Sequence, residues 1–133
     1  MSARNRTRVG ALILAGILAA LLLVAFASNT CPAETNAQPC PGAARNLVIG
    51  VGLASTAVGL LVAPFAFLGE VMARRRIVYR GAWGRAGRRG TLAGLMVATL
   101  SGLRLGDALS VPIALFVLIL AGVVEWFFAR NDR

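Results

Sequence analysis

The chain has 133 residues, of which 58% are of hydrophobic types and 14% are charged. Soluble domains are about 25% charged and cannot bury so large an apolar fraction in one core, so we expect lipid to surround the chain. The net charge is +9, and all the cations are arginines. Histidine is absent and only two cysteines occur, which removes the commonest general base and metal ligands. These numbers predict one small membrane domain that is not an enzyme and holds no metal or cofactor.

The first apolar run covers residues 9–27 and follows three arginines, Arg4, Arg6 and Arg8. A helix of this length rises about 28 Å, close to the roughly 30 Å of a bilayer core. A cleaved signal peptide also fits, because the small residues around Phe26 form an A-x-A cleavage pattern. The length favours a retained helix, and both interpretations place the following residues outside the cytoplasm.

Residues 28–46 are predicted to form an extracytoplasmic loop, because they contain three prolines, a glycine and small polar residues. Cys31 and Cys40 bracket this loop. In an oxidising compartment we expect them to form a structural disulfide, which contributes about 2.5–3 kcal/mol in the loop-entropy model. A redox-active thiol pair is the alternative, although such pairs usually have two intervening residues and this one has eight.

The second apolar run covers residues 47–68 and is rich in small residues at its centre. Small residues four apart let two helix backbones approach closely, and two such pairs occur here: Gly50 with Ala54, and Ser55 with Gly59. The hydroxyls of Ser55 and Thr56 are candidates for a polar path, but such groups more often bond to carbonyls of their own helix. This run therefore predicts a packed membrane span.

Residues 70–90 are predicted to form a basic cytoplasmic loop. Glu70 and Arg74 have the spacing of an i,i+4 pair, so the second helix is expected to continue beyond the membrane. Arginines interleaved with aromatic residues can bind nucleic acid, but a position between two apolar runs favours contact with anionic lipid headgroups and no nucleic-acid partner. The candidate lipid-contacting residues are Arg74, Arg75, Arg76, Arg80, Arg85, Arg88 and Arg89.

The third predicted span, residues 91–105, is short, because Arg104 interrupts it. We expect Arg104 to extend its charged head towards the interface so that the helix can cross a locally thinned bilayer. Arg104 and Asp107 are three residues apart and are predicted to share a helix face, as a candidate intramembrane polar pair or as an interfacial pair at a tight hairpin. The second interpretation is favoured. A helix-packing stripe is predicted from Gly94, Ala98, Gly102 and Gly106.

The fourth predicted span, residues 111–129, carries one charge, Glu125, which we expect to form a salt bridge with the basic loop. The segment from Leu120 to Arg130, LAGVVEWFFAR, resembles the last helix of membrane anchor subunits of the dimethyl-sulfoxide-reductase type. Those helices often end with a glutamate or arginine beside a string of aromatic residues. The resemblance covers one helix of four and implies a quinol-facing anchor of a redox enzyme.

The distribution of arginines predicts the topology. Twelve lie at the termini and in the basic loop, whereas Arg45 and Arg104 lie on the other side. The positive-inside rule then places both termini in the cytoplasm. We expect an all-α, integral membrane, four-helix up-down bundle in the inner (plasma) membrane of a bacterium.

The most favoured function is a non-catalytic subunit, anchor or scaffold of a larger membrane complex, with a membrane protein or a second copy as its partner. One alternative is a small oligomeric channel or carrier, lined by Arg104, Asp107, Ser55 and Thr99. Another is a thiol-redox membrane protein that uses the two cysteines.

Overall fold

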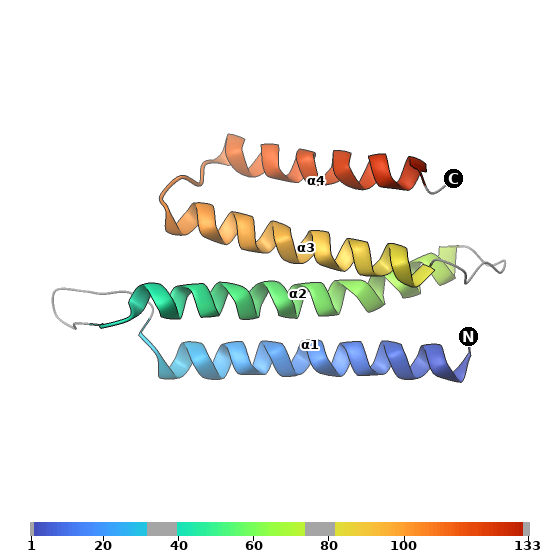
Figure 1. The fold of residues 1–133 in the computed structure, drawn as a ribbon, viewed down its shortest axis with the longest axis horizontal. Helices are drawn as coiled ribbons and strands as arrows, with labels where there is room; N and C mark the ends of the chain where they lie inside the picture. Colours follow the sequence, from blue (N-terminus) through green and yellow to red (C-terminus); the bar gives the residue numbers. More distant parts are fainter. Residues whose placement is uncertain (1, 32–39, 74–81, 132–133) are drawn as a thin grey trace.

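The computed structural model describes residues 2–31, 40–73 and 82–131, and these contain four α-helices and no strand. The predicted all-α class is therefore confirmed. The helices are α1 (Ala3–Asn29), α2 (Ala43–Ala73), α3 (Ala82–Leu105) and α4 (Val111–Asn131) (Figure 1).

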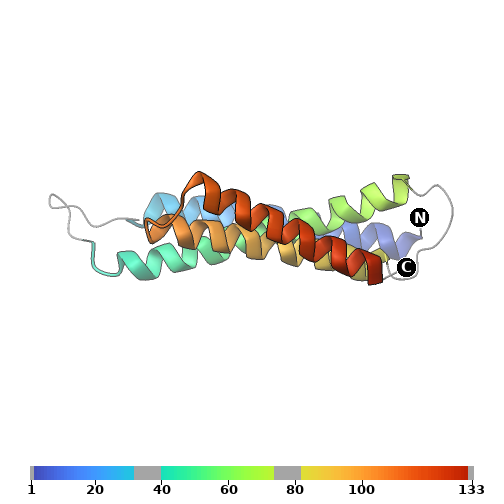
Figure 2. The same ribbon diagram turned by 90° about the horizontal axis from the view of Figure 1, so that it is seen from above.

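The helices lie side by side in chain order, and each runs antiparallel to the one before it (Figure 1). Within the described residues, α4 approaches α3 but neither α1 nor α2. The view from above shows the same elongated array, with the start of α1 and the end of α4 at one end of it (Figure 2). We call this the termini end, and the opposite one, which holds Cys31 and Cys40, the disulfide end. The arrangement is an open row, in which α4 does not close against α1.

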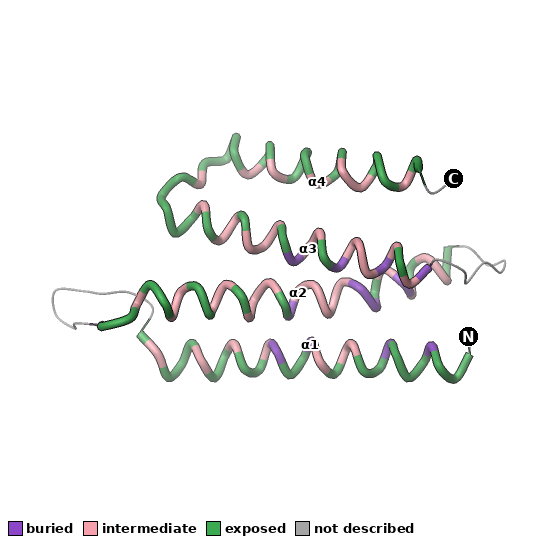
Figure 3. The backbone as a smooth tube through the Cα atoms, viewed as in Figure 1, coloured by how far each residue is buried: buried purple, intermediate pink, exposed green. Residues whose placement is uncertain are grey.

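Three of the helices, α1, α2 and α4, are long and apolar enough to cross a membrane. Helix α3 is not among them, because three arginines lie in its first turns and Arg104 lies in its last. Large apolar side chains are widely exposed, and α4 has no buried residue at all (Figure 3). Leu22 is 60% exposed and Phe116 is 64% exposed. Such a surface is stable only where lipid or another protein covers it, which indicates a membrane protein.

The structure corrects the predicted boundaries of the basic loop. Helix α2 continues to Ala73, as the sequence predicted for its end, but α3 already begins at Ala82, so residues 70–73 and 82–90 are helical and not part of a loop. The arginine-rich start of α3 is helical because its small residues pack inward: Ala82 is 3% exposed and Ala86 is fully buried. Arg74, Arg75, Arg76 and Arg80 lie outside the described residues.

The disulfide between Cys31 and Cys40 is confirmed, with the two Cα atoms 6.2 Å apart. It joins the end of α1 to the start of α2, and Cys40 is only 1% exposed. Gly42, which follows, has a φ of 87°, a conformation that side chains other than glycine rarely adopt, and its carbonyl accepts a hydrogen bond from the N–H of Asn46. The bridge therefore fixes how α1 and α2 meet at this end.

Candidate helix-binding groove and arginine–glutamate cluster

Helices α2 and α3 are in direct backbone contact where small residues face one another. A Cβ atom added to Gly90 would lie 2.6 Å from the carbonyl oxygen of Gly59 and 2.9 Å from Cβ of Ala63. One added to Gly94 would lie 2.9 Å from the carbonyl oxygen of Ser55. Side chains cannot be accommodated at these distances, so both glycines are required by the close approach.

Only some of the predicted helix-packing residues take part in this contact. Gly94 lies in it, as does the predicted pair of Ser55 with Gly59. Gly102 has no neighbour, and Gly106 meets only carbonyls of its own helix. The prediction missed Gly90 because it assigned that residue to the loop, although its four-residue spacing from Gly94 extends the same stripe towards the termini end.

An apolar groove of about 600 Å³ runs beside this contact between α2 and α3. We call it the α2/α3 groove. Its walls combine small residues with two leucines, Leu60 and Leu95. Ala98, from the predicted stripe, also lines it. The wall residues used below are Ser55, Gly59 and Leu60 of α2, and Gly87, Leu95 and Ala98 of α3.

The hydroxyl groups near the groove are bonded within their own helices, as the sequence analysis favoured. Ser55 Oγ donates to the carbonyl oxygen of Val51 at 2.7 Å, and Thr56 Oγ1 donates to that of Gly52 at 2.8 Å. Thr99 Oγ1 bonds to the carbonyl of Leu95 in the same way. These groups therefore add little polarity to the groove, which suits an apolar occupant.

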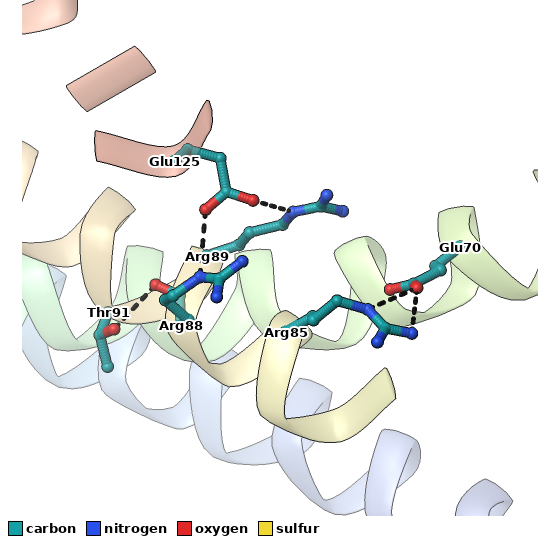
Figure 4. A network of polar contacts seen from close by, with 6 residues as sticks. All are labelled: Glu70, Arg85, Arg88, Arg89, Thr91 and Glu125. Atoms are coloured by element: carbon teal, nitrogen blue, oxygen red, sulfur yellow. Dashed lines mark hydrogen bonds and ion pairs between the residues drawn. The ribbon is translucent and has the colours of Figure 1, made fainter. Parts of the chain in front are cut away.

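Two glutamates bind three arginines of α3 at the termini end, and we call these five residues the arginine–glutamate cluster (Figure 4). Oε1 of Glu70, on α2, accepts hydrogen bonds from Nε of Arg85 at 2.7 Å and from Nη2 at 2.5 Å. Oε1 of Glu125, on α4, accepts from Nε of Arg89 at 2.8 Å, and Oε2 accepts from Nε of Arg88 at 3.4 Å. The cluster thus links α2, α3 and α4.

The cluster changes the interpretation of the basic segment. The predicted salt bridge of Glu125 is confirmed, but it is made from α3 instead of from a loop. Glu70, which was predicted to pair with Arg74, binds Arg85. Three of the arginines assigned to anionic lipid therefore have carboxylate partners. The guanidinium of Arg88 also lies 5.2 Å from the ring centre of Phe128, which adds a cation–π contact between α3 and α4.

An aromatic contact that the sequence analysis did not find joins three helices beside this cluster. The ring of Trp83 on α3 stacks on that of Phe67 on α2, with centroids 4.3 Å apart. Nε1 of Trp83 donates a hydrogen bond of 3.3 Å to Oδ1 of Asn5 on α1, and Val9 packs into the same core. Phe67 is completely buried. The termini end is therefore the best-packed part of the row.

The predicted common helix face of Arg104 and Asp107 is wrong. Helix α3 ends at Leu105, and Asp107 follows in a left-handed conformation with a φ of 53°. The N–H of Asp107 bonds to the carbonyl of Arg104, and the N–H of Ala108 bonds to that of Leu103, which is the Schellman pattern of a helix end. No ion pair joins Arg104 to any described residue.

Together these features define a small helical membrane protein. Within the described ranges, no group of three or more His, Cys, Asp or Glu side chains is arranged to hold a metal ion. Comparisons with protein-family models, curated proteins and solved structures found no match to this chain. The resemblance of α4 to the anchor subunits therefore stays a prediction from sequence.

Proposed function

We propose that the chain is a non-catalytic subunit of a larger membrane complex, in which the α2/α3 groove receives a membrane helix of a partner protein. The observation that carries this proposal is the groove itself, an apolar channel beside a glycine contact on a row of helices that remains open. Helices in lipid associate through close packing and not through the hydrophobic effect, so exposed small residues favour contact with another helix.

The dimensions of the groove suit a helix. From Gly87 to Ala98 its α3 wall extends about 16 Å, at roughly 1.5 Å per residue, which is about three helical turns. Leucines from the two walls can flank an inserted helix, while the small, half-buried Gly87 and Ala98 leave room for its backbone. The hydroxyls are already bonded, so the occupant need not supply polar partners.

The proposal includes the orientation of the chain in an inner membrane, with the termini end in the cytoplasm. The start of α1, the end of α4 and the arginine-bearing start of α3 lie at this end (Figure 1). The positive-inside rule assigns such an end to the cytoplasm and leaves the disulfide in the oxidising compartment outside. A retained first helix is supported by the contact of Gly16 on α1 with Leu61 on α2.

The alternative functions have less support. A carrier pathway lined by Ser55 and Thr99 would use hydroxyls that are bonded within their own helices. Reactive thiol pairs usually have two intervening residues, whereas eight separate the exposed Cys31 from the buried Cys40.

The test is purification of the intact chain in mild detergent, followed by mass spectrometry of the proteins that remain bound. Gly87→Leu places a large side chain in the groove, and an added Cβ there has no neighbour within 4 Å, so the fold should accept it. Gly84→Leu is the matched control, because Gly84 is equally open but does not line the groove.

We expect one membrane protein to co-purify with the wild type and with Gly84→Leu, and to be lost from Gly87→Leu. Equal retention by both variants would exclude the groove as the contact. Recovery of the wild-type chain alone, or bound only to further copies of itself, would contradict the subunit proposal.

A further inference from the structure

A second cavity lies at the disulfide end, where α1, α2 and α3 meet. It has a volume of about 260 Å³ and is distinct from the α2/α3 groove, with which it shares no lining residue. We call it the outer pocket. On α2 it extends from Asn46 to Ala54, which is about 12 Å along the helix axis at roughly 1.5 Å per residue. It is therefore an elongated cavity aligned with the helices.

The two ends of the outer pocket differ in chemistry. Among the lining residues, the polar Thr30, Asn46 and Arg104 lie at or near the ends of their helices. Leu23 and Val51 line it deeper within the helices. A cavity that is polar at the level of the helix ends and apolar below matches a molecule with a polar head and an apolar chain.

Arg104 determines which sign of charge the head must have. It is the basic residue in the last turn of α3, and none of the described carboxylates pairs with it, since Asp107 lies beyond the helix end. A guanidinium at the boundary of an apolar cavity is stabilised by an anion that accepts hydrogen bonds from its fork of N–H groups.

Ser101, one turn before Arg104, supplies a second polar contact. The hydroxyls of Ser55, Thr56, Thr91 and Thr99 donate to carbonyls of their own helices. Ser101 also lines the outer pocket, but no such bond joins its hydroxyl to a described residue. It is therefore a donor available to an occupant.

We propose that the outer pocket binds one anionic phospholipid of the outer leaflet, with its phosphate on Arg104 and the upper part of one acyl chain between α1, α2 and α3. Phosphate is the anion that occurs at the depth of the helix ends in a bilayer, and the apolar interior continues in the direction that an acyl chain follows. The lipid would fill the space between the outer halves of the three helices.

The test uses phosphatidylglycerol that carries a photoreactive diazirine on one acyl chain, mixed into phosphatidylcholine vesicles that contain the intact protein. Illumination should label peptides from residues 23–30 and 46–54. Arg104→Gln should lower this labelling about fivefold or more, as expected when a charge-assisted hydrogen bond is lost. Arg45→Gln is the charge-matched control, because Arg45 does not line the pocket.

A second pair of variants tests the pocket independently of charge. Gly50→Leu fills the pocket, whereas Gly52→Leu makes the same change outside it, and neither position has a neighbour within 4 Å of an added Cβ. We expect only Gly50→Leu to abolish the labelling. Equal labelling by a diazirine phosphatidylcholine, equal loss in Arg45→Gln, or full labelling of Gly50→Leu would each overturn the proposal. Displacement of the labelled lipid by free palmitate at equal concentration would also overturn the proposal, because it would assign the site to a fatty acid.

Discussion

Gly90→Ala tests whether the glycine contact between α2 and α3 holds the row together. The new methyl group would lie 2.6 Å from the carbonyl oxygen of Gly59 and 2.9 Å from Cβ of Ala63. Neither neighbour is a flexible side-chain end, so the two helices must separate by several tenths of an ångström along their closest approach.

The magnitude follows from two opposed effects. Overpacking of a close contact typically lowers the free energy of unfolding by about 1–3 kcal/mol. Alanine is a better helix former than glycine, which raises the free energy of unfolding by up to about 1 kcal/mol. We therefore expect Gly90→Ala to lower the free energy of unfolding by up to about 2 kcal/mol, and to be about 1–3 kcal/mol less stable than a glycine-to-alanine change without the overpacking. Gly102→Ala is the control on the same helix. Its added Cβ meets no neighbour, so this variant should be as stable as the wild type or up to about 1 kcal/mol more stable.

The assay is reversible unfolding in mixed micelles by increasing the fraction of SDS, followed through the fluorescence of Trp83, which stacks on Phe67 between α2 and α3. Trp126 is the other tryptophan of the chain, so Trp126→Phe serves as the background. The reasoning is refuted if Gly90→Ala and Gly102→Ala unfold at the same SDS fraction.

Two further predictions concern the ends of the row. A double-mutant cycle of Glu125→Gln with Arg89→Gln should give a coupling of about 1 kcal/mol, because their 2.8 Å contact is only partly shielded from solvent; a coupling of zero would show that the pair does not attach α4. Cys31→Ser should lower the free energy of unfolding by about 2.5–3 kcal/mol, as the loop-entropy model gives for a ten-residue ring. Reductant should reproduce that loss in the wild type, and an unchanged unfolding curve in reductant would contradict the structural role of the bridge.

The features that depend on local pattern were predictable from sequence. Uninterrupted apolar runs predicted the positions of α1, α2 and α4, because lipid requires each crossing segment to bond its backbone internally. The four-residue spacing of Ser55 and Gly59 predicted a packing face, and Cys31 and Cys40 predicted the disulfide. Each of these signals lies within a single segment of the chain.

The start of α3 could not be predicted in this way. Without known partners, its arginines are typical of a solvated loop. Their partners are distant in the sequence: Glu70 is 15 residues from Arg85, and Glu125 is 36 residues from Arg89. Glycine at 106 was a weak local signal for the helix end at Leu105, and the sequence analysis did not use it. The left-handed residue that ends the helix is Asp107, a position at which glycine is the usual residue.

The central claim is that the chain lies in a membrane with its termini end in the cytoplasm. The most direct test is to determine on which side of the membrane each end of the row lies. Alkaline phosphatase, active only outside the cytoplasm, and a green fluorescent protein, fluorescent only inside it, can each be fused within residues 32–39 and after Arg133. The proposed orientation requires phosphatase activity from the first position and fluorescence from the second. Fluorescence from the first position, or phosphatase activity from the C-terminus, would contradict it.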